Sequence, residues 1–445
     1  MKIMFTTDLL KNILKRATMV SSYGRRLWFA SAFLIFNFQF SIFNLVHAQR
    51  HIVYSDDIRS LQVVAGSRWM DLPIVTMGSG ERVNISFDEL SHEYHRYIYR
   101  VRKLDRDWKE SEGVFPPDFL DGVRSEMVIE DYLESINTTQ DYTHYRVQIP
   151  NDQCRLKMSG NYRVDVYDND ADNEDAKVLS AFFLVNEDAT NVGFNCSGDT
   201  DIDLRRSHQQ LTVKADHQKL KATDPLNQVK GYVVQNNRWD NMLLLPTPTS
   251  FNQQFMEWNH CKDLIYDGGN EFHKFEILDI HRNSFNVDSK SWDKENEIWH
   301  VYAQPDEKRP SYSYDETPKG AFLIRNSDNR ESNTTSEYVM VHFTLLTPEP
   351  FPYPVYVDGM WAVRNGDKYW NDKYRMTYDK ELKAYTCAVP LKYGYYSYQY
   401  LMVKPDGTAA IPPTEGSFYE TKNLYTLLFY FRGLLDRTDR LVGVK

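Results

Sequence analysis

Few residue patterns in this sequence could carry catalysis or hold a metal ion. His92 and His95 stand three residues apart, whereas the two histidines of a helical zinc motif stand four apart. They also precede an expected strand, so we interpret them as part of a surface turn. His260 adjoins Cys261, but a nucleophilic Cys–His pair depends on proximity in space, so adjacency in sequence is only a weak indication.

The acidic run Asp168–Asp175 is a second candidate, because alternating carboxylates on a flexible loop can surround calcium. An EF-type loop needs Gly at its sixth position and Glu at its twelfth, where this run has Asn173 and Leu179. A solvated hairpin tip explains the run without an ion. We favour the hairpin tip and leave calcium binding open.

A sugar-stacking platform is a third candidate. Trp361, Trp370 and Tyr374 occur where a starch-binding module would carry its stacking residues. We favour a core position for Trp361, with the other two lining a loop, because large aromatic side chains dominate core packing.

No other signature of catalysis stands out. The sequence has no nucleophile elbow, phosphate loop or dinucleotide fingerprint, and nothing singles out a carboxylate pair for glycoside hydrolysis. We therefore predict a protein that is not an enzyme, with no catalytic, cofactor-binding or metal-binding residues and no cofactor. Its binding residues are not identified by sequence.

Residues 1–48 have the pattern of an export signal. A basic stretch precedes an apolar run that ends at Val46, and Ala48 supplies the small residue that signal peptidase reads. We expect cleavage before Gln49, because polar breaks in the run argue against an uncleaved membrane anchor. The basic stretch is unusually long, which leaves the true start codon open.

The chain that follows this signal is acidic. Removing residues 1–48 takes away six basic residues and one acidic residue, which leaves a net charge of −15. Such a chain repels phosphates, so nucleic acid and anionic lipid headgroups are poor partners. No later segment is apolar enough for a membrane-spanning helix, so we expect no direct membrane span in the mature chain.

The four cysteines are Cys154, Cys196, Cys261 and Cys387. An exported protein meets an oxidising compartment, so one or two disulfides are open, with three alternative full pairings. Small buried thiols are an equal alternative. The spacing is too wide for a metal site.

Period-two alternation dominates the chain, and helical periodicity is scarce. Short alternating runs bounded by Gly, Asn, Asp and Pro are typical of antiparallel sandwiches. They occur at 83–87, 162–167, 178–185, 339–345 and 396–400. We predict an all-β fold of tandem immunoglobulin-like or early-set antiparallel β-sandwich units after the signal peptide.

Three β units account for the mature chain. We expect a first β-sandwich domain at 49–186, a second, irregular β domain at 187–336, and a third, early-set immunoglobulin-like domain at 337–445. In the first unit Trp108 follows a strand and is placed to fill the sandwich core. The polar stretch 326–336 is interpreted as a linker.

Seven short strings resemble the type IX secretion system plug protein family, in the family's order over about 300 residues. They are Asp141–Tyr145, Ser159–Tyr162, Gln235–Asp240, Gly268–Phe272, Leu391–Tyr396, Glu415–Thr421 and Arg437–Gly443. The chain departs from the family at Lys103-Leu104, where a His-Cys pair is expected, and at Tyr393, where Gln is expected. These departures bear on local packing rather than on the role.

The resemblance implies a role rather than a reaction. Members of this Bacteroidota-type family bind the periplasmic mouth of the large outer-membrane β-barrel through which type IX cargo leaves, and they seal it when cargo is absent. The resemblance thus implies a periplasmic location at the inner face of the outer membrane, with the translocon barrel as partner. The alternative is an envelope protein that binds carbohydrate through the third unit.

Overall fold

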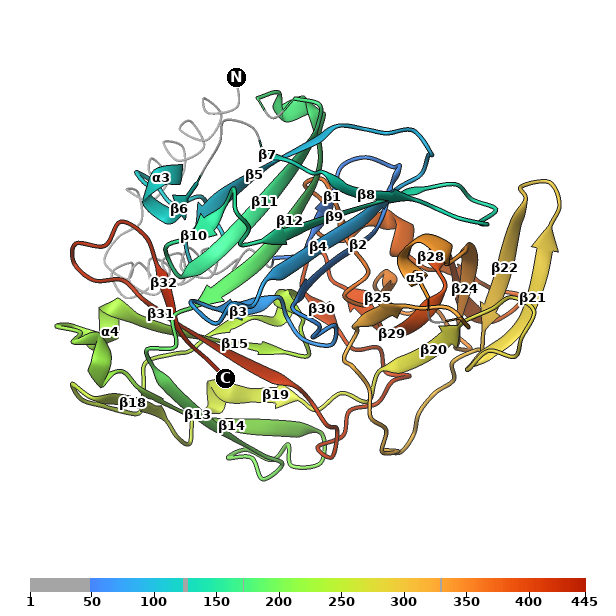
Figure 1. The fold of residues 1–445 in the computed structure, drawn as a ribbon. Helices are drawn as coiled ribbons and strands as arrows, with labels where there is room; N and C mark the ends of the chain where they lie inside the picture. The colour runs from blue at the N-terminus through green and yellow to red at the C-terminus, as the bar shows by residue number, and fades with distance from the viewer. Residues whose placement is uncertain (1–48, 123–126, 171, 329) are drawn as a thin grey trace, which may run out of the picture. The chain divides into compact units, whose positions relative to one another are not determined.

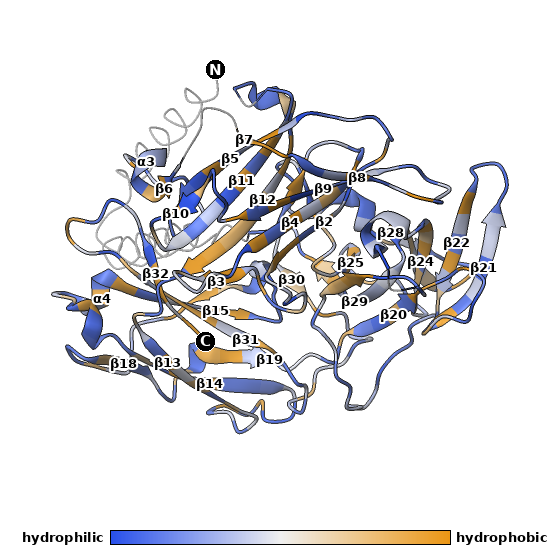
Figure 2. Ribbon diagram, in the orientation of Figure 1, coloured by the Kyte–Doolittle hydropathy of each residue, from blue (hydrophilic) through white to orange (hydrophobic). Residues whose placement is uncertain are grey.

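The computed structural model describes residues 49–122, 127–170, 172–328 and 330–445, so the predicted signal peptide lies outside it. The described chain is almost wholly β, with antiparallel strands in paired sheets (Figure 1), which confirms the predicted fold class. Figure 2 shows apolar residues gathered on strands such as β12, while most connecting loops are hydrophilic. Within the described ranges, no helix has the length and apolar character needed to cross a membrane.

The first sandwich packs the sheet β26-β1-β12-β11-β5-β7 against the sheet β2-β4-β9-β8. Its strands are β1 (Ile52–Val53), β2 (Ile58–Ala65), β3 (Ile74–Thr76), β4 (Val83–Glu89), β5 (Tyr97–Leu104), β6 (Leu120–Asp121), β7 (Met127–Val128), β8 (Asp131–Glu134), β9 (Thr143–Ile149), β10 (Arg155–Leu156), β11 (Gly160–Asp168), β12 (Lys177–Asn186) and β26 (Arg364–Asn365). The helical turns are α3 (Pro116–Phe119) and η1 (Glu174–Ala176). Alternation buries Val83, Ile85 and Phe87 completely inside the core, because successive side chains of a strand point to opposite faces.

The second sandwich packs the sheet β13-β14-β18-β17 against the sheet β16-β15-β31-β32. Its strands are β13 (Asn191–Ser197), β14 (His208–Asp216), β15 (Val229–Gln235), β16 (Leu243–Leu244), β17 (Ser250–Phe251), β18 (Phe255–Trp258), β19 (Ile265–Asp267), β31 (Tyr425–Phe431) and β32 (Arg440–Val444). Short helical turns are η2 (Gln218–Leu220), α4 (Pro225–Gln228), η3 (Trp239–Asn241) and η4 (Lys262–Leu264).

The third sandwich packs β20-β29-β23, extended by β25 and β30, against β21-β22-β24-β28-β27. Its strands are β20 (His273–Ile277), β21 (Val287–Asp293), β22 (Ile298–Ala303), β23 (Phe322–Ile324), β24 (Tyr338–Leu346), β25 (Val355–Asp358), β27 (Thr377–Asp379), β28 (Ala384–Lys392), β29 (Gly394–Val403) and β30 (Ala409–Ala410). Helical turns are α5 (Ser332–Thr335) and η5 (Asp372–Tyr374).

Strand pairing departs from the expected boundary at residue 336. β20 and β23 both pair with β29, so 273–324 shares a sheet with the third unit, and 326–336 connects strands inside it. β31 pairs with β15 over seven residue pairs, so the chain ends in the sheet of the second unit. On this pairing we propose that the second domain comprises 191–267 with 425–444, and the third 273–410.

Candidate functional site

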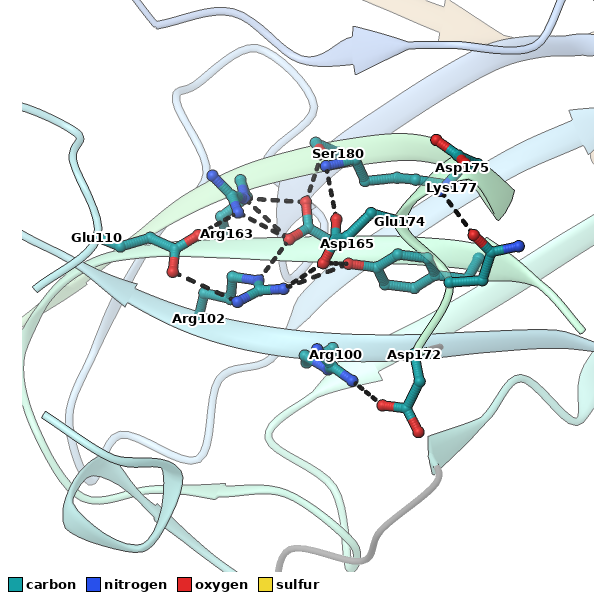
Figure 3. Close-up of polar contacts among 12 residues, drawn as sticks. Arg100, Arg102, Glu110, Arg163, Asp165, Asp172, Glu174, Asp175, Lys177 and Ser180 are labelled. Carbon is teal, nitrogen blue, oxygen red and sulfur yellow. Dashed lines mark hydrogen bonds and ion pairs between the residues drawn. The ribbon is translucent and has the colours of Figure 1, made fainter. Parts of the chain in front are cut away.

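The acidic run predicted as a hairpin tip lies beside cationic side chains. Asp172 pairs with Arg100 at 2.7 Å, and Glu174 pairs with Arg102 at 2.8 Å (Figure 3). No group of three or more His, Cys, Asp or Glu residues in the described parts of the chain could hold a metal ion. Arginine side chains therefore pair with two of the carboxylates that calcium would have to bind.

The fully buried carboxylate beneath this tip is Asp165. It pairs with Arg102 and with Arg163, each at 2.9 Å, and accepts a 2.5 Å hydrogen bond from Ser180 (Figure 3). Burial of a charge is tolerated only when it is paired and hydrogen-bonded, and Asp165 meets both conditions. Asp165 therefore has a structural role, because Arg102, Arg163 and Ser180 engage both of its carboxylate oxygens.

The two histidines considered for zinc have separate partners. The Nε2 atom of His92 lies 2.8 Å from the hydroxyl of Ser135, and the Nδ1 atom of His95 lies 3.7 Å from Asp168. Both precede β5 in a turn, as the sequence predicts.

The aromatic residues considered for sugar binding do not form a platform. Trp361 is 6% exposed, belongs to the third core, and donates its indole N–H to the carbonyl of Ser397 at 3.0 Å. Trp370 and Tyr374 are half-buried, and the indole N–H of Trp370 bonds the carbonyl of Gly407. A ring inside the core cannot stack on a sugar, so the core position that we favoured for Trp361 is confirmed.

All four cysteines are free. Cys154 lies in the first core and Cys261 in the second, while Cys387 packs against the third core and Cys196 is exposed on β13. Burial raises the pKa of Cys387 to about 11, and that of Cys154 to about 12. Cys154 and Cys261 are thus small buried apolar groups, and none of the four cysteines takes part in a disulfide.

Residues of the seven strings that resemble the plug family lie at junctions between the sandwiches. The first junction joins the first and third sandwiches. Asp88 of β4 and Lys392 of β28 are 0% and 1% exposed, with 2.7 Å between Oδ2 and Nζ. Tyr338 donates its hydroxyl to the same carboxylate at 2.6 Å, and the Nδ1 atom of His144 lies 2.7 Å from its other oxygen. Strings 141–145 and 391–396 thus supply two partners of one buried carboxylate.

Electrostatics favour the charged form of Asp88 although it is buried. Burial raises the pKa of Asp88, but Lys392 and His144 more than offset that effect, so the pKa lies below its ordinary value. Burial lowers the pKa of Lys392, with Asp88 opposing the change.

A second junction ties the C-terminal segment to the first sandwich. The buried carboxylate of Asp439 accepts hydrogen bonds from the side chain of Arg106 at 2.7 Å and from its backbone N–H at 3.0 Å. Lys103 donates to the carbonyl of Asp439 at 3.0 Å, and burial lowers its pKa to about 8 against the opposing effect of Asp105 and Asp439. A Cβ at Gly160 would lie 2.8 Å from the carbonyl oxygen of Asp439, so strings 159–162 and 437–443 touch here.

The two connections between the second and third sandwiches form a third junction. Glu271, between β19 and β20, pairs with Lys319 and accepts the backbone N–H of Lys422 at 2.8 Å. Glu415, between β30 and β31, pairs with Arg309 and with His273. Glu271 of string 268–272 and Glu415 of string 415–421 are each 2% exposed, so each crossing is held by buried charge.

A small, mainly apolar cavity of about 50 Å³ lies where all three sandwiches meet. Trp239 of string 235–240 contacts Trp108 at its wall, with ring centroids 5.2 Å apart. Trp108 is buried, but it lies at this junction rather than within the first core, where we expected it. Arg50 pairs with Asp358 at 2.6 Å on the same wall and thereby joins the first sandwich to the third.

Comparisons with known proteins match the first sandwich in one case and most of the chain in another. A protein-family model described as Type 9 secretion system plug protein 1st domain matches residues 58–187. A crystal structure of a hypothetical protein from Parabacteroides merdae is 34% identical and covers 89% of this chain and 98% of its own, with a TM-score of 0.83. The chain belongs to the type IX secretion plug family. Comparison with curated proteins gives no match.

Membership in the plug family indicates a role in type IX secretion and an envelope location. It also favours a structural role over a catalytic one. The plug-family strings supply part of the contacts that hold the sandwiches together, among them Lys392 and Asp439. The buried carboxylates Asp240, Glu271, Glu415 and Asp439 of these strings are each paired with a cation of the chain, so the arrangement can fix domain positions.

Many residues of these junctions lie outside the strings, and two of them are buried or partly buried carboxylates of the first sandwich. Asp88 and Asp105 each accept hydrogen bonds from another part of the chain, Asp105 from Thr438 at 2.8 Å. Asp88 alternates with Phe87, so the sequence pattern assigns it to the outer face of its sheet. The third sandwich covers that face, and local sequence carries no signal for such a contact.

Proposed function

We propose that this plug-family chain binds the periplasmic side of the type IX translocon barrel and seals it when cargo is absent. It does so by obstruction, without catalysing a reaction. A wide outer-membrane barrel encloses water and leaks unless a folded body blocks it. The proposed location is the periplasm, at the inner face of the outer membrane.

The observation that carries this proposal is that strings shared with the plug family lie at the contacts between sandwiches. Strings shared with the plug family supply one partner of ion pairs that cross between sandwiches: Lys392 pairs with the buried Asp88, and the buried Asp439 pairs with the partly exposed Arg106. A body that blocks a pore under load must resist being pulled apart, and buried, hydrogen-bonded charge pairs resist separation because each partner alone is strongly unfavourable in the interior. The fold therefore suits obstruction better than recognition of a small ligand.

Affinity capture from the native host tests the proposal. The chain carries a tag after Lys445, whose side chain is exposed, and the outer membrane is solubilised gently. We expect a very large β-barrel, identified by mass spectrometry, at close to one copy per tagged chain. Complexes isolated through a tagged cargo should lack the chain.

Ion conductance of the purified barrel in a planar bilayer tests sealing separately. Adding the chain to the periplasmic side should lower the conductance, and adding it to the other side should not. Capture of sugar-uptake proteins alone, or an unchanged conductance, would contradict the proposal.

A further inference from the structure

The strand at one edge of the first sandwich has an open side. β8 is the last strand of the sheet β2-β4-β9-β8, and among the residues that the structure describes no strand pairs with its outer side (Figure 1). All four of its residues, Asp131–Glu134, are exposed, so side chains on both faces reach solvent. Natural proteins block open edges with lysine, proline or a bulge, because an open edge can add another strand. β8 contains neither residue, and its pairing with β9 is regular.

The backbone groups of β8 alternate between β9 and solvent. The N–H of Ser135, just after the strand, bonds the carbonyl of Tyr142 at 2.8 Å. In an antiparallel pair every second residue bonds the partner strand, so Leu133 is turned toward β9, whereas Tyr132 and Glu134 are turned outward. The N–H and C=O groups of those two residues are therefore open to a further strand, and an extended chain satisfies such a pattern of donors and acceptors.

Exposed apolar side chains flank the open edge on both faces. Tyr132 is 39% exposed and contacts Tyr94, which is 52% exposed, with ring centroids 4.8 Å apart. Leu133 on the opposite face is 55% exposed, as is Ile136 just beyond the strand. The N–H of Ile136 bonds the carbonyl of Thr334 in α5 at 2.8 Å, which holds this end in place. An added strand would cover these side chains, and a group of exposed apolar residues marks an interaction site.

A free carboxylate stands at each end of β8. Residues 127–141 contain four acidic residues and no lysine, arginine or histidine. Glu130 directly precedes the strand and Glu134 ends it. Both are exposed, and neither has an ion pair within the described ranges. A lysine or arginine on an added strand would find a partner there without displacing an existing cation.

The arginines of β9 and of the turn before β5 already have partners. Arg146 on β9 pairs with Asp131 at 2.7 Å, and Arg96 on the turn is half-buried and also partnered. His92 on the same turn lies 3.6 Å from Asp141. The edge therefore keeps the charge of its two free glutamates, which favours a cationic segment over a neutral or acidic one.

We propose that β8 takes up an extended, lysine- or arginine-bearing segment of the translocon barrel as an additional strand. This inference rests on the proposed function and assigns its contact surface. Backbone hydrogen bonds to Tyr132 and Glu134 hold the segment in register, and the apolar side chains on the two faces anchor it. Glu130 and Glu134 select its charge.

A second copy of the chain is a poor occupant of this edge. Antiparallel pairing of β8 with itself would set the acidic ends of the two strands against each other, and like charges directly opposite destabilise a sheet. An anionic bilayer is repelled by the same carboxylates and offers no backbone to complete the edge.

Capture of the barrel by tagged full-length variants tests the edge. Glu134→Pro removes one outward N–H but leaves the pairing with β9, because proline is tolerated where the N–H of an edge strand faces solvent. The double variant Glu130→Lys, Glu134→Lys keeps the backbone and reverses the charge. We expect each of the two to recover at least about tenfold less barrel than the natural chain.

The matched control is Glu349→Lys with Glu381→Lys, because these glutamates are exposed on the third sandwich and the net charge changes equally. The control should recover the barrel normally, and all variants should keep the melting temperature of the natural chain, since the changed side chains are exposed. Hydrogen exchange gives a second measure. The amides of Tyr132 and Glu134 should exchange more slowly in the complex with the barrel than in the free chain.

The outcomes separate the edge from the plug role. Normal capture by either edge variant, or unchanged exchange at Tyr132 and Glu134, would overturn the added strand and leave the proposed function standing. An equal loss of capture in the control would overturn it too, because the position of the charge would then not matter. A dimer of the natural chain that Glu134→Pro dissolves would overturn the barrel as occupant. Failure of the natural chain to capture the barrel would overturn both proposals.

Discussion

At the scale of single residues, this plug-family chain buries charged side chains at positions where apolar side chains would pack equally well. Asp88 and Lys392 are almost wholly buried, and replacing both by apolar residues of similar size is often neutral or stabilising in other proteins. What a buried pair adds is orientation, because each charge tolerates few arrangements of its partner. We infer that the pair fixes the first sandwich against the third in one arrangement.

Removing one partner should show this dependence directly. Lys392→Met leaves the Asp88 carboxylate buried without its cation, and we expect a loss of about 3–5 kcal/mol in the free energy of unfolding, measured in urea. Lys373→Met is the matched control, since its pair with Asp56 is equally short at 2.6 Å but 43% and 83% exposed. The control should lose less than about 1 kcal/mol. Equal losses would contradict the assigned role, and Asp88→Asn added to Lys392→Met should recover part of the loss.

Lys103 predicts a pH dependence of stability. Its pKa in the folded chain is about 8, below the ordinary 10.5, because it is buried. As pH rises from about 8 to 10.5, the folded chain loses this proton before the unfolded chain does, so the free energy of unfolding should rise by about 3 kcal/mol. Below pH 8 the proton is bound in both states and contributes no slope. Lys103→Met should remove this rise, and the difference between the two urea titrations measures it; parallel titrations would contradict the assignment.

At the scale of elements, the sequence predicted the strands better than their partners. Alternation located β4, β11, β24 and β29, because each buries one face and local pattern reports that face. It did not predict that β31 returns to β15, because pairing across about 190 residues depends on which edges are left open in the fold. The polar stretch 326–336 was read as a linker for the same reason, although it only connects strands of one sandwich.

The start of β11 offers a test of how closely the elements approach. Gly160 has φ of +123°, and an added Cβ would lie 2.3 Å from the Lys103 ammonium and 2.8 Å from the Asp439 carbonyl. Gly160→Ala should therefore push the C-terminal segment away, in addition to the backbone strain. Gly78→Ala is the control, because its φ is also positive but nothing lies within 4 Å.

We expect Gly160→Ala to lower the free energy of unfolding by at least about 2 kcal/mol more than the control does. Chemical denaturation of the two variants measures that difference. Equal effects would mean that the contact between β11 and the C-terminal segment is loose.

At the scale of the whole molecule, the structural role of the plug-family strings follows from the contacts that they make with other parts of the chain. The sequence identified them and implied a role, but not that they would meet in pairs, since each partner of a pair lies in another part of the chain. Asp88–Lys392 links the first and third sandwiches, Arg106–Asp439 links the first sandwich to the end of the chain, and the end of the chain completes the second. Glu271–Lys319 and Glu415–His273 link the second and third sandwiches, so the links close a ring of contacts and no sandwich can separate without breaking ion pairs that have at least one buried partner.

Such a ring predicts that the three sandwiches open as one unit, as an obstructing body requires. Hydrogen exchange followed by mass spectrometry should give the slowest amides of β11, β15 and β24 the same opening free energy, within about 1 kcal/mol. In a variant with Asp88→Ala and Asp439→Ala, two links of the ring are cut and the three values should diverge. The ring is contradicted if these three opening free energies already differ by several kcal/mol in the natural chain. Sandwiches that open independently could be pulled apart one at a time in a pore under load.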